Sequence, residues 1–260
     1  MNAGEGIASI GIANYRAESL DGACKVIKAI KPISSIDERK ALLAAFAAVH
    51  KPFVVSFVNA HALNIAWNDP VFAKNLYRSD VLLKDGIGVS LLTRGLGINS
   101  GINMNGTDFI PEIAEAVKGK RIAVLGTQEP YLTLAANKIR ELGGNVVLTV
   151  DGFQPHASYF NVVRDAAPEV VILGMGMPKQ EAVSMLLADA LETPTLIVNG
   201  GAILDFWANR FPRAPLAWQK MRLEWLFRML QEPGRLWKRY TLGGFAFVSR
   251  YFRMKFSGQF

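Results

Sequence analysis

The 260-residue sequence predicts an α/β protein with a mainly parallel sheet and helices on both of its faces. Short runs rich in β-branched residues alternate with longer amphipathic stretches, which is the pattern of successive βα units. Each short run ends in glycine or a polar residue, as strands do where the chain turns toward a helix. Half of the residues are apolar and a fifth are charged, which excludes a disordered chain, a collagen or a coiled coil.

Six of the short runs predict strands. They are Phe53–Val58, Val81–Leu83, Arg121–Leu125, Asn145–Val150, Val170–Leu173 and Thr195–Val198. Ligands of open α/β sheets bind beyond the carboxyl ends of the strands, so the polar residues at these ends are the first candidates for a functional site.

The stretches between the strands predict helices. They cover Ile36–Val49, Ala60–Asn68, Pro70–Ser79, Gly88–Leu96, Asp108–Val117, Tyr131–Leu142, Tyr159–Ala166 and Pro178–Ala190. Before them, Ile7–Ile30 predicts a short strand or hairpin followed by a helix, and this part contains no chemical motif.

A shift in composition divides the chain into a core, residues 1–209, and a C-terminal appendage, residues 210–260. The appendage holds 11 basic and two acidic residues, a net charge of +9, whereas the core has −2. It also holds 12 of the 26 aromatic residues, a mixture that suits an anionic membrane surface or a nucleic acid. Helices are predicted at Leu216–Leu230 and Gly234–Tyr240, and Phe245–Phe256 has the composition of an interfacial anchor.

Cysteine content and hydropathy indicate in which part of the cell the protein is located. The single cysteine, Cys24, allows no internal disulfide and no multi-cysteine metal site. Residues Met1–Ala29 do not show a charged and then apolar leader, and no uninterrupted apolar run reaches 18 residues. We therefore expect a cytoplasmic protein.

Asp85 is the leading candidate for a catalytic residue. It follows a predicted strand in Asp85-Gly-Ile-Gly88, where the glycines leave room for a ligand beside the backbone. A carboxylate there could act as a general base, although an aspartate at this position also suits the cap of the next helix. Asn59, at another strand end, could bind a sugar or a base, or it could complete a turn.

The segment Gly106-Thr-Asp108 precedes a predicted helix. Thr107 or Asp108 could cap that helix, and its N-terminus could receive a phosphate.

A glycine-rich turn, Gly174-Met-Gly-Met-Pro-Lys-Gln-Glu181, leads from a strand into a helix. Lys179, Gln180 and Glu181 fall in the first helical turn, where Lys179 and free N–H groups could hold a diphosphate. The turn is neither a P-loop nor a dinucleotide fingerprint, because it lacks Gly-Lys-Ser/Thr and a third glycine at the required spacing.

Other polar residues carry weaker signals. Asp205 could contact a ligand or cap a local turn, and we favour the cap. His50, His61 and His156 lack the spacing of metal ligands, although His61 is close enough to Asn59 in the sequence to stay under consideration. No Asp-X-Asp motif is present to clamp a metal-bound nucleotide diphosphate, so we expect no metal site and no cofactor.

Three basic residues of the appendage, Arg228, Arg235 and Lys238, follow one another at spacings of seven and three. On a continuous helix they would share one face, although Pro233 interrupts the sequence between them. Converging cations could neutralise a leaving diphosphate, and the alternative is a solvated basic face.

Taken together, these segments resemble the WecG/TagA/CpsF family of bacterial glycosyltransferases. The resemblance runs from about Ile7 to Tyr240. It is carried by Asn59, Asp85-Gly-Ile-Gly88, Asn105-Gly-Thr-Asp108, Gly174-Met-Gly-Met-Pro-Lys-Gln-Glu181, Gly200-Gly-Ala202, Arg213-Ala-Pro215, Glu224-Trp-Leu-Phe-Arg228 and Glu232-Pro-Gly-Arg235.

The resemblance implies a Rossmann-like enzyme that transfers a sugar from a UDP-sugar to a sugar on a polyprenyl diphosphate, with inversion and without metal. It implies that Asp85 is the general base and that Asn59 and Gln180 line the pocket. Arg228, Arg235 and Lys238 would belong to an appendage that closes over the site at the inner face of the cell membrane. We expect the substrate-binding set to be completed by Asn103, Thr107, Asp108, Lys179 and Glu181.

The segment Asn103-Met-Asn-Gly106 departs from the teichoic-acid branch of the family, which has Arg-Val-X-Gly there. It looks more like exopolysaccharide members such as the xanthan-type glucosyltransferase. On this basis we favour UDP-glucose as the donor, with UDP-ManNAc or UDP-ManNAcA as the other candidates.

Two other functions remain open from the residues alone. A Rossmann-type NAD(P) oxidoreductase would normally carry Gly-X-Gly-X-X-Gly, which is missing. A non-enzymatic nucleic-acid binder could use the basic appendage, but the core has no recognised reading module, and we expect no nucleic-acid partner. The resemblance also implies that the protein could form a homo-oligomer, because family members can self-associate.

Overall fold

The computed structural model describes residues 20–260, apart from the side chain of Arg235. Ile7–Ile30 was predicted to form a short strand or hairpin followed by a helix, and residues 7–19 of this stretch lie outside the described range. Within the range, residues 20–28 are helical.

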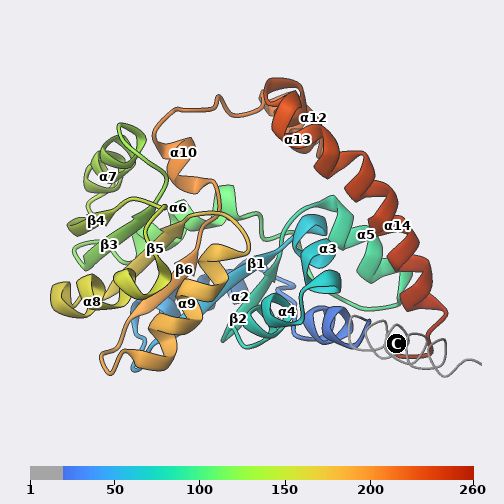
Figure 1. The fold of residues 1–260 in the computed structure, drawn as a ribbon, viewed down its shortest axis with the longest axis horizontal. Coiled ribbons are helices and arrows are strands. Elements are labelled where there is room, and N and C mark those ends of the chain that lie inside the picture. Colours follow the sequence, from blue (N-terminus) through green and yellow to red (C-terminus); the bar gives the residue numbers. More distant parts are fainter. Residues whose placement is uncertain (1–19) are drawn as a thin grey trace, which may run out of the picture.

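A six-stranded parallel sheet forms the centre of the molecule (Figure 1). All six predicted strands are confirmed, with ends that shift by one residue at most. They are β1 (Phe53–Val58), β2 (Val81–Lys84), β3 (Arg121–Gly126), β4 (Asn145–Val150), β5 (Val170–Gly174) and β6 (Leu196–Asn199). Their order across the sheet is β2-β1-β6-β5-β3-β4.

Helices surround this sheet, and the α/β prediction is confirmed. The helices of the core are α2 (Ile36–Ala47), α3 (Ala60–Asn68), α4 (Pro70–Tyr77), α5 (Ile87–Gly95), α6 (Gly106–Ala116), α7 (Tyr131–Glu141), α8 (His156–Ala166), α9 (Lys179–Ala190) and α10 (Ile203–Trp207). Those that follow are α11 (Leu216–Lys220), α12 (Glu224–Gln231), α13 (Pro233–Tyr240) and α14 (Leu242–Lys255).

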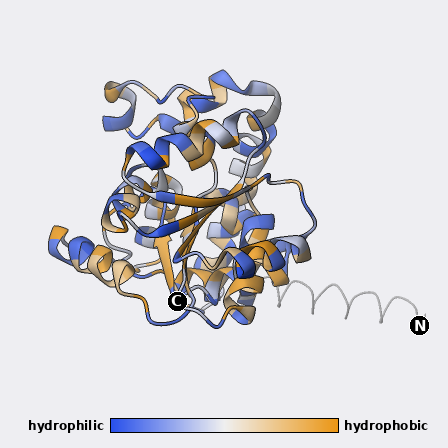
Figure 2. Cartoon of the chain, turned by 90° about the vertical axis from the view of Figure 1, so that its left-hand side faces the viewer, coloured by the Kyte–Doolittle hydropathy of each residue, from blue (hydrophilic) through white to orange (hydrophobic). Residues whose placement is uncertain are grey.

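The alternation of side chains along the strands builds a core on each face of the sheet. Val55, Val198 and Ile172 lie in register on neighbouring strands and face α2, α6 and α7. Val54 and Ile197, one residue earlier on their strands, face α8 and α9. Every strand except β4 is buried on both faces, as in other parallel sheets, and Figure 2 shows apolar residues along the central strands.

The carboxyl ends of β3 and β5 approach each other so closely that they require glycine. A Cβ on Gly126, where φ is 148°, would lie 2.4 Å from the carbonyl group of Gly174. The N–H of Thr127 then donates to the Gly174 carbonyl oxygen at 3.1 Å. The turn residues that follow these strands are thereby drawn together at one edge of the sheet.

The helix predicted at Leu216–Leu230 is two helices, α11 and α12. The break lies at Arg222, whose φ of 60° is in the left-handed region that ends a right-handed helix. Gln219 also donates a side-chain hydrogen bond to the Ala214 carbonyl oxygen at 2.6 Å, which ties α11 to the chain before it. The break turns α12 to a new direction.

The final helix, α14, packs along the core beside α3 and α5 (red in Figure 1). Arg250 donates to Asn64 and Asn68 of α3, and Met254 is buried among the side chains of the core. A Cβ on Gly95 would lie 2.4 Å from the hydroxyl of Tyr251, so α5 needs glycine where α14 crosses it. None of the helices within residues 20–260 has the length and apolarity needed to cross a bilayer.

Candidate active site

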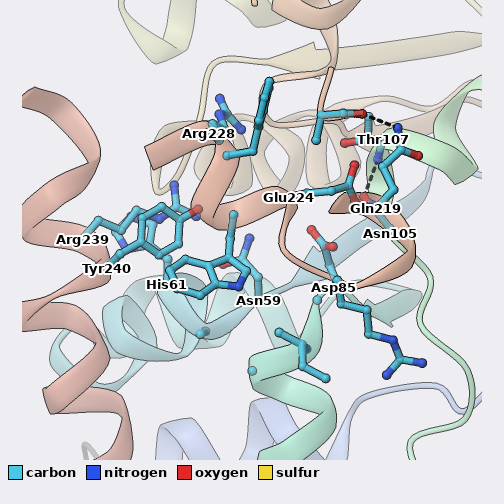
Figure 3. A pocket seen from close by; sticks show the side chains of 18 of the residues that line it. Asn59, His61, Asp85, Asn105, Thr107, Gln219, Glu224, Arg228, Arg239 and Tyr240 are labelled. Atoms are coloured by element: carbon cyan, nitrogen blue, oxygen red, sulfur yellow. Dashed lines mark hydrogen bonds between the residues drawn. The ribbon is translucent and has the colours of Figure 1, made fainter. Parts of the chain in front are cut away.

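A cavity of about 520 Å³ lies beyond the carboxyl ends of β1 and β2, with the chain after β6 as its other wall (Figure 3). The core side contributes mainly polar groups, and the appendage contributes cations and aromatic rings. The core residues include Asn59, His61, Asn64, Asp85, Asn103, Asn105, Thr107 and Asp108. Those of the appendage include Phe211, Arg213, Arg222, Glu224, Trp225, Arg228, Arg239, Tyr240 and Phe247.

Asp85 is held in place by the end of β2. Its backbone N–H donates to the Val58 carbonyl oxygen at 2.9 Å, which continues the pairing of β1 and β2. Gly86, with φ of 91°, then turns the chain and is itself the N-cap of α5. Asn103 accepts a hydrogen bond from the Gly86 N–H at 2.7 Å. Asp85 therefore does not cap α5, and its side chain is available on the cavity wall.

The surroundings of Asp85 disfavour its charge. Burial raises the pKa of this carboxyl to about 6, against the opposing effects of the Arg239 guanidinium and a hydrogen bond from Asn59. The carboxylates of Glu224 and Asp108 add a smaller upward effect on the same pKa. The result is a carboxyl group that is mostly ionised at pH 7 yet accepts a proton more readily than an ordinary aspartate.

Asn59 serves the turn and the cavity at once. It is the N-cap of α3, where its Oδ1 accepts the Ala62 N–H at 3.0 Å. Its side chain also donates to Asp85. The two alternatives that the sequence left open for Asn59, a turn residue or a pocket residue, are therefore compatible.

The N-terminus of α6 opens onto the cavity, but its cap differs from the prediction. Asn105, rather than Thr107 or Asp108, is the N-cap, and its side chain accepts the Thr107 N–H at 2.9 Å. The Asp108 carboxylate pairs with Arg213 of the appendage. Because capping falls to Asn105, the side chains of Thr107 and Asp108 face the cavity instead.

Glu224, the first residue of α12, joins the appendage to the core. Its carboxylate accepts from Asn105 at 3.2 Å and lies 3.6 Å from Arg213. Burial raises the pKa of Glu224, and the Arg213 guanidinium opposes this rise. In Figure 3 the Asp85 carboxylate points toward the segment that carries Glu224.

The three basic residues predicted to converge, Arg228, Arg235 and Lys238, do not all line the cavity. Arg228 lies on the cavity wall, with its guanidinium 5.2 Å from the centre of the Phe206 ring. Lys238 is exposed on α13 and lies outside the lining of the cavity. Arg235 also belongs to α13, but its side chain is not among the described groups.

Lys179, Gln180 and Glu181 begin α9 as predicted, and they lie outside the lining of this cavity. The Lys179 ammonium donates to the carbonyl oxygens of Gly152 and Gln154 at 2.8 and 2.7 Å. Gln180 accepts the Gly201 N–H at 3.0 Å and donates to Glu181 at 2.8 Å. These three side chains thus hold the loops around the ends of β4, β5 and β6.

The cap favoured for Asp205 is not found at α10, the helix that contains it. Ala202 is the N-cap, and Asp205 instead accepts from Thr127 at 2.8 Å and pairs with Arg210 at 3.2 Å. Across residues 20–260, no group of three or more His, Cys, Asp or Glu side chains is arranged to hold a metal ion.

The sequence model of the glycosyl transferase WecG/TagA/CpsF family matches residues 29–259. The chain belongs to this family. It is therefore a glycosyltransferase, in place of the oxidoreductase and the nucleic-acid binder that the sequence also left open.

Within this WecG/TagA/CpsF member, several cavity residues had no signal of their own in the sequence. Arg213, Arg222 and Glu224 lie in segments that carry the family resemblance or beside them, but their residue types alone suit a solvated face. His61 lacks metal-ligand spacing and stayed under consideration only because it is close to Asn59 in the sequence. It lines the cavity, and burial together with the Arg239 charge lowers its pKa to about 4.

Proposed function

We propose that this glycosyltransferase moves a hexose from a UDP-sugar to a sugar carried on a polyprenyl diphosphate, with inversion and without a metal ion. The observation that carries the proposal is the position of Asp85. Its carboxylate lies on the wall of a cavity large enough for a sugar nucleotide fragment, accepts a hydrogen bond from Asn59 and has its pKa raised to about 6.

In the proposed reaction Asp85 acts as a general base. It removes the proton of an acceptor hydroxyl, and that oxygen attacks the anomeric carbon of the donor from the face opposite the leaving group. The new C–O bond forms as the bond between the anomeric carbon and the phosphate oxygen breaks. UDP leaves with the electron pair of the broken bond, and the proton stays on Asp85, so the configuration inverts.

The cations of the appendage suit the departing diphosphate. Arg228 and Arg222 line the same cavity as Asp85, and guanidinium groups bind phosphate oxygens with paired hydrogen bonds. Charge that develops on UDP would therefore be stabilised by fixed cations. We keep Arg235 and Lys238 in the proposed binding set on the strength of the family resemblance, together with Lys179, Gln180 and Glu181 at the start of α9.

We propose that the core and the appendage contribute different parts of the active site. Residues 1–209 supply the base and most of the polar groups, and residues 210–260 close over them. The contacts of Arg213 with Asp108 and of Glu224 with Asn105 support this closure, because each joins the appendage to the N-terminus of α6.

UDP-glucose is the donor we favour, with UDP-ManNAc or UDP-ManNAcA as the alternatives. Asn103 stands where the teichoic-acid branch has arginine, and here its side chain accepts the N–H of Gly86, next to Asp85. A neutral amide at this point supports a neutral hexose more than a sugar with a carboxylate. The pathway that fits is the synthesis of an exopolysaccharide or another cell-surface polysaccharide.

The acceptor lipid requires the enzyme to work at a membrane, and α14 suits the inner leaflet. Its exposed apolar side chains recur every three or four residues, so they share one face of the helix. They are Leu242, Phe245, Val248, Phe252 and Phe256, and Phe245 and Phe256 are 78% and 80% exposed. A basic helix with such a face binds anionic lipid without spanning the bilayer.

The test is UDP release by the purified full chain with a short polyprenyl-diphosphate-sugar acceptor and a panel of UDP-sugars, with EDTA present. We expect release that depends on the acceptor, occurs with one donor and survives EDTA. Asp85→Asn removes the base and keeps the shape, so it should lower kcat by about 10²–10⁴-fold.

Two results would contradict the proposal. Undiminished release by Asp85→Asn would remove Asp85 from its role as the base. Loss of release in EDTA, restored by a divalent cation, would overturn the metal-independent mechanism. Asp80→Asn serves as the matched control, because Asp80 is an aspartate just before β2, at the end of the sheet away from the cavity.

A further inference from the structure

Lys84, the last residue of β2, has a buried ammonium group that the proposed reaction does not use. The residue is 5% exposed. Its Nζ donates to the Gly101 carbonyl oxygen at 2.5 Å and to the Ser100 hydroxyl at 3.0 Å. Burial lowers the pKa of this lysine, and the charges of Arg222 and Arg94 lower it further. In the part of the chain that the structure describes, the ammonium has no ion pair, so its contacts are with neutral groups of the backbone and of a serine.

Both of these acceptors belong to the loop of residues 96–105, which joins α5 to α6. Further along the same loop, the Met104 N–H donates to the backbone carbonyl oxygen of Lys84 at 2.9 Å. The Met104 side chain is itself buried in the core. Lys84 therefore holds the loop at two points, and Asn103 lies between them.

Asn103 faces the cavity from this loop. Its Oδ1 accepts the N–H of Gly86, next to Asp85, at 2.7 Å. This hydrogen bond sets the orientation of the amide, with the oxygen toward the backbone. Within residues 20–260 the Nδ2 of Asn103 has no acceptor, so its N–H groups are available to a ligand in the cavity. The hydroxyl and phosphate oxygens of a sugar nucleotide are acceptors for such groups.

We infer that Lys84 is a positioning residue for the donor site: its ammonium fixes the loop so that Asn103 presents its amide N–H groups to the sugar nucleotide. The inference rests on the proposed function, since it names the residue that fixes a donor-binding group of that reaction. Lys84 itself lies outside the lining of the cavity, so it acts through the loop and not by contact with the substrate.

Asn105, at the end of the same loop, depends less on Lys84. Its Oδ1 accepts the Thr107 N–H at 2.9 Å, and its Nδ2 donates to Glu224 at 3.2 Å. These bonds hold Asn105 from α6 and from the appendage. Loss of the Lys84 ammonium should therefore act mainly on Asn103, and its effect should be weaker binding of the donor.

The test is a double-mutant cycle on the full chain, in which UDP release reports the KM of the UDP-sugar that the donor panel selects. Lys84→Met keeps an apolar stem of similar length and removes the hydrogen-bond donor, and Asn103→Ala removes the group that it positions. Each single variant should raise the donor KM by about fivefold to thirtyfold. The double variant should raise it little beyond Asn103→Ala alone, and the KM of the lipid-linked acceptor should stay near its original value.

Controls separate positioning from a general effect on stability. Lys120→Met removes a half-buried lysine just before β3, at the end of the sheet away from the cavity, and should leave the donor KM unchanged. The Tm of Lys84→Met should change by a few degrees at most, because the loss of two hydrogen bonds is offset by the removal of a desolvated charge. Ser100→Ala weakens the same contact from the loop side, so it should also raise the donor KM, and it replaces Lys84→Met if that variant does not fold.

The inference and the proposed function fail in different ways. Additive effects of Lys84→Met and Asn103→Ala on the donor KM, in a protein that transfers sugar, would overturn the inference. An unchanged donor KM in both Lys84→Met and Ser100→Ala would overturn it as well. If Asp85→Asn is fully active, the proposed base is wrong, and the cycle still decides the role of Lys84. If the unaltered protein releases UDP from no donor, the proposed function fails and the inference fails with it.

Discussion

The carboxyl groups of Asp85 and Glu181 both have a pKa that burial raises, yet their surroundings suit different roles. Asp85 lies on a cavity wall and accepts a hydrogen bond from Asn59, and the charge of Arg239 opposes the rise of its pKa. Glu181 is 1% exposed, and among the described residues its Oε2 has no hydrogen-bond partner. The pKa of Glu181 rises to about 7, and Gln180 is the donor to its other oxygen.

Glu181 should therefore lower the stability of the protein as pH rises. A pKa raised from 4.5 to about 7 means that the folded state binds the proton more tightly, so stability is lost as pH increases between these values. Glu181→Gln keeps the shape without the charge, and its Tm should exceed that of the unaltered protein at pH 8 by a few degrees. At pH 4 the two should unfold at similar temperatures.

Thermal unfolding at several pH values checks this prediction. Glu192→Gln, at an exposed position just after α9, is the control and should leave the pH dependence unchanged. A lower Tm of Glu181→Gln at pH 8 would contradict the argument. A raised KM in the same variant would support the substrate-binding role proposed for Glu181.

Sequence reasoning found the residues whose local position was informative. Asp85 could be predicted because a carboxylate at a strand end beside glycines lies at the functional edge of a parallel sheet. The cap of α6 could not be predicted between Asn105, Thr107 and Asp108, because all three are good N-cap residues within four positions. That Arg239 lines the same cavity as Asp85 could not be predicted, because the two residues are about 150 positions apart in the sequence.

At the scale of elements, the predicted helix Leu216–Leu230 shows what local patterns omit. Neither glycine nor proline lies at the break between α11 and α12, so the sequence contains no signal that ends a helix there. Arg222 takes a left-handed conformation in the structure, and its side chain lines the cavity. Tertiary contacts can override helix propensity in this way.

The packing of α14 on α3 includes polar contacts as well as apolar ones. We call the hydrogen bonds of Arg250, Asn64, Asn68 and Gly243 the polar clamp. Arg250 donates to Asn64 and to Asn68 Oδ1, the latter at 3.1 Å, and its guanidinium lies 5.6 Å from the Trp67 ring. Asn64 in turn donates to the Gly243 carbonyl oxygen at 2.7 Å. Because both Asn64 and Gly243 line the cavity, the clamp links the position of α14 to the site.

Arg250→Ala should loosen α14. The loss of charge-assisted hydrogen bonds in a half-buried place should cost about 1–3 kcal/mol of unfolding free energy. Limited proteolysis should cut the variant faster between α13 and α14. Arg253→Ala, on the same helix at an exposed position, is the control, and equal cleavage rates in the two variants would contradict the role of the clamp.

At the scale of the whole molecule, the strands could be predicted but their order could not. After β2 the chain forms α5 and α6 and then crosses the sheet to β3, which lies three positions from β1. The two positions between β1 and β3 are filled later, by β6 and β5. The pattern of residues in each strand reports burial on both faces, which is the same for every inner position of the sheet. Order is therefore set by long-range pairing that no single segment encodes.

The separation of charge between core and appendage gives the molecule one basic end, and α14 brings aromatic side chains to that end. A triple variant with serine at Phe245, Phe252 and Phe256 should bind vesicles of anionic lipid about tenfold more weakly than the unaltered full chain. The reason is that each replacement removes an exposed apolar ring that would insert into the lipid. Binding of the unaltered protein should fall with salt but persist in part, since insertion of rings is not screened as charge is. Vesicle sedimentation measures both effects.

A control from the core separates this surface from exposed apolar residues in general. Leu134, Phe153 and Val162 are also exposed but lie on the core, and their replacement by serine should leave vesicle binding unchanged. Equal losses in the two triple variants would mean that adsorption is nonspecific. Tight, salt-dependent binding to DNA with none to vesicles would instead assign the basic end to nucleic acid, because phosphate contacts alone produce that pattern.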